Sequence, residues 1–409
     1  MSHPAPPPDA RAARIAVSAL FFANGAGVAS ILPRLPAIKE SLALSNAELG
    51  LAVAAMPVGG LLAGGLVGLL IARFGSGRTA VVAGTAAALL LGGIGLAPTW
   101  ALLALAYLVL GVFDATMDAA MNAHSLGVER RYGRSILQGF HGMWSVGGMA
   151  GGAAGALAAG FGVPVPVHAA IIGAALATVV LLAAGWLLPA RVADVHAAGE
   201  LDAEHIHVRN APRLLRVLGP IATLGVLCVV LQGSAATWSA VFLADVLRQP
   251  AGIAALAFVV YMASMALGRL TNDRWIDRFG GARVVRAGAL IGAAGVGVVI
   301  TGGVLGVAPL AFIGFAAIGI GSSPMFPVMI GAAGSRPGIP AGHGVALVSW
   351  LVRIGLMFAP ATVGIAADAA GLGAAFAIPL VAALAIATLA VPLTGGTHVA
   401  GPRGPVPAG

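Results

Sequence analysis

Apolar residues run in long uninterrupted stretches along this chain, and polar residues gather in short segments between them. Many of the apolar stretches are free of charge over about twenty residues, the length of α-helix that crosses a lipid bilayer. The pattern therefore predicts an all-α membrane protein. Glycine, proline and arginine residues mark the limits of twelve predicted transmembrane helices: 15–33, 49–71, 79–98, 100–123, 136–160, 164–188, 217–243, 251–271, 284–306, 308–333, 344–367 and 371–393.

A polar segment separates the first six predicted spans from the last six. Residues 191–216 contain too few apolar side chains to form a domain, which favours a cytoplasmic linker between two six-helix halves, 15–190 and 217–393. Residues 1–14 are predicted to form a cytoplasmic tail. Residues 394–409, rich in glycine and proline, are predicted to be disordered.

Composition excludes several classes of protein. Hydrophobic residues make up 59% of the chain and charged residues 9%, against about a quarter charged in soluble domains. The net charge of +8 comes from arginines scattered singly or in pairs, so we expect no nucleic-acid partner. Cys228 is the only cysteine, which excludes an intrachain disulfide and a thiolate metal cluster. We expect no metal and no cofactor.

The distribution of basic residues predicts the orientation. With an even number of spans, the tails and the even-numbered connections share one side, and eighteen of the 22 basic residues lie there. The other side has Arg34, Lys39 and Arg248, while Arg353 lies within a span. Because basic residues accumulate on the cytoplasmic side, both termini are predicted to be cytoplasmic.

Two connections carry related sequences half a chain apart. Residues 73–78 read RFGSGR, and residues 278–283, 205 positions later, read RFGGAR. Two parallel six-helix repeats joined by a linker resemble the major facilitator superfamily of transporters. Asp277 to Gly280 match the core of that superfamily's loop motif, whereas Ala72 replaces the acid of the first copy. The resemblance implies a set of cytoplasmic gating residues: Arg73, Arg78, Asp273, Asp277, Arg278, Glu129 and Arg130.

The segment from Asp118 to Gly148 is more specific, and it resembles the fucose–proton symporter branch and its uncharacterised bacterial relatives. In those symporters an acid four residues before an asparagine couples transport to protons, a role that the resemblance gives to Asp118, with Asn122 as the asparagine. Gln138 and His141 match substrate-contacting positions, although the symporters have asparagine in place of the histidine. The first span here contains Asn24 but lacks the sugar-contacting acid of the symporters, so the resemblance implies transport more firmly than it implies fucose as the substrate. It also implies a location in the inner membrane of a bacterium.

The acidic residues in the fourth span support proton coupling independently of the resemblance. Asp114 and Asp118 are four positions apart, so they share one face of a helix. Each ionised carboxylate at mid-bilayer costs roughly 2.5–3.5 kcal/mol, and two so close repel each other. We therefore predict that Asp118 takes up the coupled proton, with Asp114 as the second candidate. The alternative is a structural role, in hydrogen bonds or in an ion pair with Arg353.

Arg353 lies about ten residues into the eleventh span, roughly 15 Å from its cytoplasmic end, and a guanidinium there needs a partner. Asp114, Asp118 and a substrate carboxylate or phosphate are the three alternatives. Other polar side chains in the spans could bind substrate or hold neighbouring helices together. The predicted substrate-binding residues are Asn24, Asn122, Gln138, His141, Trp144, Gln232, Trp238 and Arg353.

The leading hypothesis is a monomeric, proton-coupled transporter that carries a small solute, a sugar or a sugar-like metabolite, by alternating access. Its partners are the solute, the proton and the lipid bilayer. A proton-driven exporter of drugs or metabolites would use the same fold and acids. An intramembrane prenyltransferase could bind magnesium diphosphate through Asp114–Asp118 and Asp273–Asp277, but such enzymes have about three fewer helices, and arginines interrupt the second pair. We therefore do not expect the protein to be an enzyme.

Overall fold

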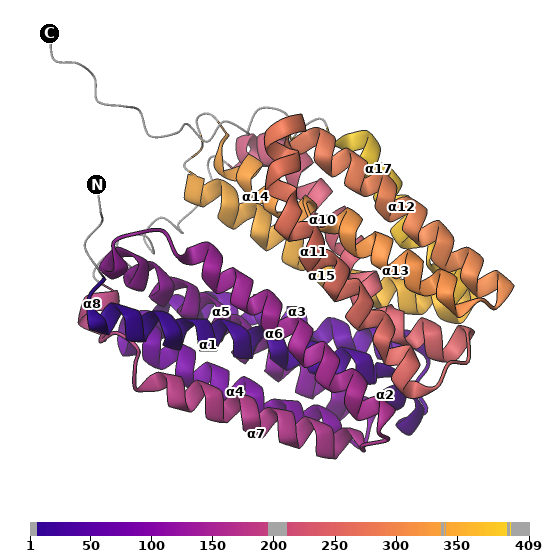
Figure 1. The fold of residues 1–409 in the computed structure, drawn as a ribbon, viewed down its shortest axis with the longest axis horizontal. Coiled ribbons are helices and arrows are strands. Elements are labelled where there is room, and N and C mark those ends of the chain that lie inside the picture. The colour runs from indigo at the N-terminus through magenta and orange to yellow at the C-terminus, as the bar shows by residue number, and fades with distance from the viewer. Residues whose placement is uncertain (1–5, 195–210, 337–338, 340, 391–392, 394–409) are drawn as a thin grey trace, which may run out of the picture.

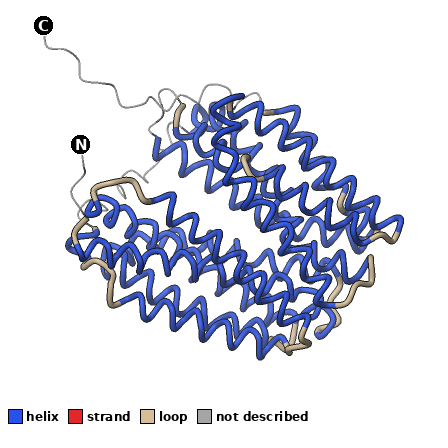
Figure 2. The backbone as a smooth tube through the Cα atoms, viewed as in Figure 1, coloured by secondary structure: helices blue, strands red, loops and turns tan. Residues whose placement is uncertain are grey.

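The computed structural model describes residues 6–194, 211–336, 339, 341–390 and 393. These ranges are helical and contain no strand, as the tube in Figure 2 shows. The predicted disordered tail and the centre of the predicted linker lie outside them.

Each predicted span coincides with a helix or with two short helices in succession. The helices with their bounds are α1 (Pro8–Ile31), α2 (Leu35–Ser41), α3 (Asn46–Phe74), α4 (Ser76–Leu96), α5 (Trp100–Tyr132), α6 (Leu137–Gly160), α7 (Val165–Ala184), α8 (Ala190–Ala193), α10 (Ala211–Val241), α11 (Ala251–Phe279), α12 (Gly281–Leu305), α13 (Ala308–Ser322), α14 (Met325–Gly334), α15 (Ala341–Ala370), α16 (Leu372–Ala375) and α17 (Ala377–Leu389). Two short turns, η1 (Leu32–Arg34) and η4 (Phe242–Val246), join α1 to α2 and follow α10.

Eleven membrane-crossing segments in the described ranges are long and apolar enough to span a bilayer. The segment that brings the total to the predicted twelve is α6, which has 24 residues but a lower hydropathy because it is rich in glycine. It packs between α1 and α11. The structure thus agrees with the predicted fold class.

Several helices extend beyond the predicted spans. Helix α5 continues to Tyr132 and α11 to Phe279, so the charged residues at these ends lie on the last helical turns and not in loops. One consequence is a correction: Arg269, which the sequence pattern assigns to the cytoplasmic side, lies inside α11, about 15 Å before its end. The turns that follow α3 and α11 are alike, with Gly75 and Gly280 at φ +83° and +82°, a region that favours glycine.

The helices form two groups, α1–α8 and α10–α17, which we call the N-terminal and C-terminal halves (Figure 1). Within the N-terminal half α1 packs on α6, α3 on α5, and α4 on α7. Within the C-terminal half α10 packs on α15, and α13 packs on α11 and α12. Two seams join the halves, one between α3 and α15 and the other between α6 and α11.

The halves are tied together at the end of the molecule that carries α2, which we call the α2 end. Lys39 Nζ on α2 lies 2.5 Å from Asp245 Oδ2 of η4. The Asp368 carboxylate of α15 accepts hydrogen bonds of 2.9 Å from the backbone N–H groups of Asn46 and Ala47, at the start of α3. These contacts join charges and backbone groups of different halves.

Toward the opposite end, which we call the α8 end, the two groups diverge (Figure 1). A Cβ atom added at Gly64 or Gly65 of α3, or at Gly139 or Gly142 of α6, would meet no atom within 4 Å. Both seams are therefore closed near the α2 end and open near the α8 end.

The predicted tenth span is broken into α13 and α14. Pro324 lies in the break, directly before α14, and has no backbone N–H to continue the helical hydrogen bonds. Gln232 Nε2 of α10 donates a 3.0 Å hydrogen bond to the carbonyl oxygen of Ser322, at the end of α13. The side chain of Gln232 thus stabilises a helix end within its own half.

Candidate functional site

Three side chains from three helices form a hydrogen-bonded chain around Asp114. Asp114 Oδ1 on α5 accepts a 2.9 Å hydrogen bond from Asn24 Nδ2 on α1. Asn24 Oδ1 in turn accepts one of 2.9 Å from Trp144 Nε1 on α6. Asp114 and Asn24 also line a cavity of about 20 Å³, which is room for one water molecule. Asp114 is therefore held inside the N-terminal half.

Asp118, one helical turn from Asp114, faces the other half. Its Oδ2 atom lies 3.8 Å from Arg353 Nη2 on α15, and the two side chains are 41% and 39% exposed. Asn122 Nδ2 donates to Asp118 Oδ1 at 3.1 Å. Of the three partners considered for Arg353, Asp118 is thus within ion-pair distance. The long contact and the exposure indicate a weak pair that can be broken.

Arg353 lies in the seam between α3 and α15, close to its open part. A Cβ atom added at Gly60 would lie 3.6 Å from Arg353 Nη1, whereas one turn further on Gly64 faces open space. The Asp118–Arg353 pair therefore stands at the point where this seam opens.

The second seam opens at another arginine. Near the α2 end, a Cβ atom added at Gly152 of α6 would lie 2.7 Å from a ring carbon of Phe258 on α11. Further along, Arg269 Nη1 of α11 lies 3.4 Å from Ser145 Oγ of α6, one helical turn from Gly142, where an added Cβ atom would meet open space. Arg269 therefore occupies in this seam the place that Arg353 occupies in the other.

Sequence reasoning missed Arg269, although the internal repeat contained the signal. The predicted second span ends at 71, four residues before Gly75, whereas the predicted eighth span ends at 271, nine residues before the equivalent Gly280. Extending the eighth span to the same distance from its glycine places Arg269 well inside the membrane helix.

The described charges of the two seams meet at one level of the molecule. Trp144 and Ser145 are neighbours on α6, so the Arg269 contact lies beside the Asn24–Asp114 chain. His141, one turn before Ser145, is exposed. Its ring packs edge-on against the ring of Phe21, with 5.2 Å between the ring centroids. Gln138 is exposed on the same helix, toward the α8 end. Two arginines, two aspartates, an imidazole and amides thus lie near one another, with Asp114 held within the N-terminal half.

Two predicted substrate-binding residues are not part of this cluster. Trp238 is 0% exposed inside the C-terminal half, where its ring packs near Gly364. Gln232 is engaged with Ser322, as described above. In this conformation both contribute to the packing of their own half.

The predicted gating residues lie at the α8 end without bridging the halves. Glu129 Oε2 accepts hydrogen bonds from the backbone N–H groups of Ile136 and Leu137, at 2.7 and 3.0 Å, and so caps the start of α6. Arg130 Nη2 donates to the carbonyl oxygen of Ala193 at 3.2 Å.

The gating residues around the two RFG turns are exposed: Arg73, Arg78, Asp273, Asp277 and Arg278. Their contacts include the guanidinium groups of Arg73 and Arg278, which lie 5.6 and 5.4 Å from the adjacent Phe rings. In the part of the chain that the structure describes, neither Asp273 nor Asp277 forms an ion pair within 4.0 Å.

An acid from the start of the predicted linker contacts the first RFG turn. Asp194, which follows α8, accepts a 3.1 Å hydrogen bond from the Ser76 backbone N–H and another from the Ser76 hydroxyl. Ser76 Oγ also lies 2.8 Å from Nδ1 of the buried His124 on α5. The N-terminal half thus has a carboxylate at the turn where Ala72 replaces the motif's acid.

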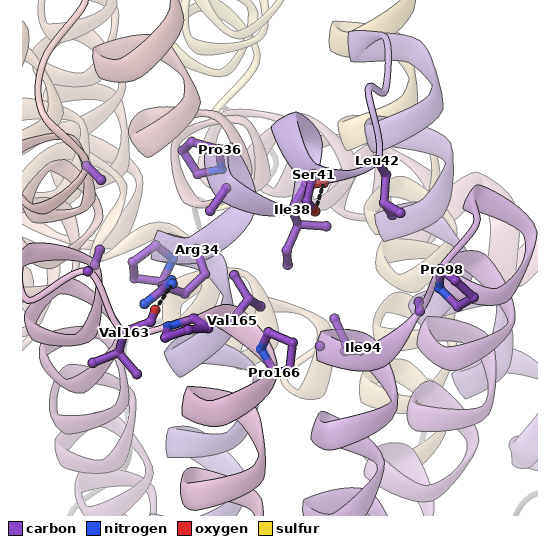
Figure 3. A pocket seen from close by; sticks show the side chains of 18 residues that line it. Arg34, Pro36, Ile38, Ser41, Leu42, Ile94, Pro98, Val163, Val165 and Pro166 are labelled. Carbon is purple, nitrogen blue, oxygen red and sulfur yellow. Dashed lines mark hydrogen bonds between the residues drawn. The ribbon is translucent and has the colours of Figure 1, made fainter.

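A separate cavity of about 650 Å³ lies at the α2 end (Figure 3). Its lining is mostly apolar and includes Ile38, Ile94 and Pro166. Arg34 is 4% exposed and donates a 2.6 Å hydrogen bond to the carbonyl oxygen of Val163. Since α2 and the ends of α4 and α6 form this cavity, it is distinct from the cluster between the halves.

The family profile of the Major Facilitator Superfamily matches residues 17–337. This chain belongs to the major facilitator superfamily. An uncharacterised transporter of the superfamily from Yersinia pestis is 32% identical over 91% of this chain and 94% of its own length. The membrane protein MosC of Rhizobium meliloti is 27% identical over 92% of this chain and 89% of its own length. The protein is thus a multi-pass membrane transporter of this superfamily.

Solved structures show the same fold. The nucleoside transporter NupG superposes with a TM-score of 0.74 at 15% identity, covering 93% of this chain and 98% of NupG. A D-xylose–proton symporter superposes with a TM-score of 0.70 at 15% identity, covering 94% of this chain and 98% of its own. The predicted family and fold class are confirmed.

Proposed function

We propose that this transporter carries a small polar solute together with a proton by alternating access, with the α8 end facing the cytoplasm of a bacterium. The observation that supports this most is the Asp118–Arg353 contact, a titratable acid of one half paired with a fixed cation of the other where their seam opens. In this proposal the structure corresponds to an inward-facing conformation.

Protonation of Asp118 changes the contact between the halves. A guanidinium keeps its charge throughout, so only the carboxyl group of this pair can become neutral. When Asp118 takes up a proton, its attraction for Arg353 is lost and Arg353 is free to move with α15 or to contact the solute. Asp114 acts with it, because two ionised carboxylates one turn apart repel each other and a proton on either relieves that repulsion.

The solute is proposed to be a sugar or a sugar-like metabolite. Gln138, Asn122 and His141 offer amide and imidazole groups that hydrogen-bond hydroxyls, and Trp144 offers a flat apolar ring beside them. A transporter with the same fold is a D-xylose–proton symporter, which supports the choice of a sugar-like solute.

The coupling is tested with Asp118→Asn, which keeps the shape of the side chain and removes its titration. Vesicles of both orientations are loaded with a panel of sugars and related metabolites while internal pH is recorded. We expect accumulation driven by a pH difference to disappear in Asp118→Asn, with exchange of bound solute retained. Glu40→Gln, which changes an exposed acid at the α2 end that belongs to no predicted site, is the control. Accumulation by Asp118→Asn under an imposed pH difference would refute the assignment and favour Asp114.

The orientation is tested with single cysteines in a Cys228→Ala background. A cysteine replacing the exposed Glu40 at the α2 end should react with an impermeant thiol reagent in intact cells. A cysteine replacing the exposed Asp273 at the α8 end should react only after the membrane is permeabilised. The opposite pattern would place the α8 end outside.

A further inference from the structure

Arg269 differs from Arg353 in having no carboxylate partner among the residues that the structure describes. The polar contact that the structure gives it is the 3.4 Å hydrogen bond from Nη1 to Ser145 Oγ. Its Nε atom is buried and has no hydrogen-bond acceptor in the described part of the chain. Asp273, one turn further along α11, lies beyond ion-pair distance, and in the described ranges no other carboxylate lies within 4.0 Å.

A guanidinium in this position is costly unless an anion accompanies it. It remains charged at every physiological pH and presents five N–H donors, of which a single neutral hydroxyl accepts one, at the limit of hydrogen-bond distance. Charged side chains at membrane depth usually pair with an opposite charge or contact a substrate. The two parallel N–H groups of a guanidinium match the two oxygens of a carboxylate or a phosphate.

We infer that Arg269 binds the acidic group of the transported solute at the seam between α6 and α11. The solute is then a small hydroxylated organic anion, such as a sugar acid, and not a neutral sugar. The inference rests on the proposed transport function and narrows its substrate class. Ser145, His141 and Gln138, successive residues along α6 toward the open end, supply hydrogen bonds for the solute's hydroxyl groups.

The charge balance of the cluster connects this inference to the proton. The cluster contains two carboxylates and two guanidinium groups. Asp118 pairs with Arg353, whereas Asp114, inside the N-terminal half, accepts a hydrogen bond from the neutral Asn24. A monoanion that enters with a proton on Asp118 leaves the total charge of the cluster unchanged. It also gives Arg269 an anionic partner while Arg353 is released from Asp118.

The test measures ligand-induced thermal stabilisation of the purified full-length protein in lipid nanodiscs. The probes are matched pairs: gluconate with sorbitol, galacturonate with galactose, and glucose 6-phosphate with glucose. We expect at least one acid to stabilise the wild-type protein at a concentration about tenfold or more below that needed for its neutral counterpart. The carboxylate and phosphate pairs distinguish the two anion chemistries, and sodium acetate at equal ionic strength controls for salt.

The Arg269 variants assign the effect to this residue. Arg269→Gln should lose the preference for the acid, and Arg269→Lys should keep part of it, because an ammonium retains the charge but not the paired donors. Arg274→Gln, which changes an exposed arginine five positions along the same helix, should behave like the wild type. Unliganded melting temperatures of all variants show that each is folded, and the lysine variant keeps the comparison available should the glutamine variant not fold.

Two results would overturn the inference. One is a wild-type response that is equal for each acid and its neutral counterpart, including no response to either. The other is an acid preference that persists in folded Arg269→Gln. Failure of the proposed function has a different signature, since proton-driven accumulation would then survive in Asp118→Asn. A proton-coupled carrier of neutral sugars would pass that earlier test and fail this one.

Discussion

The α2 end and the α8 end hold the two halves in different ways. At the α2 end an ion pair, a carboxylate that caps the start of a helix in the other half, and close backbone approach join the halves. At the α8 end the charged residues of both RFG turns are exposed and each half satisfies its own helix ends. The contacts that join the halves are therefore concentrated at the α2 end. The Asp118–Arg353 pair lies at the boundary between this joined end and the open α8 end.

The largest effect is expected from filling the α3–α15 seam. A Cβ atom at Gly50 would overlap the carbonyl oxygen of Pro360, so Gly50→Leu must push the halves apart at the α2 end. Overpacking of this kind costs about 1–3 kcal/mol. Gly64→Leu on the same helix, where a side chain meets open space, is the matched control and should cost under about 0.5 kcal/mol. Melting temperatures in detergent measure both, and equal losses would contradict the comparison.

Removing the inter-half cap should have the next largest effect. Asp368→Ala leaves the backbone N–H groups of Asn46 and Ala47 without their acceptor, a loss of about 1–2 kcal/mol. Asp368→Asn keeps one acceptor oxygen and should lose less. Asp273→Ala removes an exposed acid of the α8 end as the control. Thermal unfolding of the three variants should rank them in that order, and a control as destabilised as Asp368→Ala would show that the cap contributes nothing specific.

Breaking the central pair should cost less than a fully buried pair would. Asp118 and Arg353 are 41% and 39% exposed at 3.8 Å, so we expect a coupling of about 1 kcal/mol or less, against roughly 3–5 kcal/mol for a buried pair. Thermal stabilities of Asp118→Asn, Arg353→Gln and the double variant complete the cycle. Strictly additive losses would show that the two side chains do not interact.

The ion pair at the α2 end should contribute a similar amount. Lys39 and Asp245 are 17% and 38% exposed, and pairs of this kind contribute about 0.2–1 kcal/mol. A double-mutant cycle with Lys39→Gln and Asp245→Asn, repeated at high salt, should show a coupling that salt diminishes. A coupling that salt leaves unchanged would indicate a drier contact than the structure shows.

The smallest effect is expected at the α8 end. Asp277 matches the acid of the superfamily's loop motif, but in this conformation its side chain is exposed and forms no ion pair with a described residue. Asp277→Asn should therefore change the stability of this conformation by less than about 0.5 kcal/mol. A larger loss in the thermal melt would mean that the α8 end is held together after all.

Much of the fold could be predicted because membrane helices are recognised in a sequence by their length and hydropathy. The twelve spans and the repeated turn are local features, and Gly75 and Gly280 adopt the same conformation, as the repeat suggests. The central break of the tenth span could be expected at Pro324 for the same reason.

The site was less predictable because its residues come from separated helices. The acids and Arg353 stand out as charges in apolar spans, but three partners were possible and the sequence does not choose among them. Trp238 and Gln232 also lie in spans, yet they face their own half. A helix that is apolar all round gives no periodicity to tell an inner face from an inter-half face. Arg269 was missed for another reason: it lies two residues before 271, the end of its predicted span, and was counted with the basic residues of the cytoplasmic side.

The bond between Asp194 and Ser76 has a consequence for how the chain can be divided. Asp194, which accepts the hydrogen bond from the Ser76 N–H, follows α8 and lies more than a hundred positions after Ser76 in the sequence. During synthesis the Ser76 N–H at the start of α4 therefore cannot form this hydrogen bond until nearly half of the polypeptide has been made. A gene cut after residue 194 yields a first fragment with this bond intact, whereas a cut before Ala190 leaves the Ser76 N–H without it.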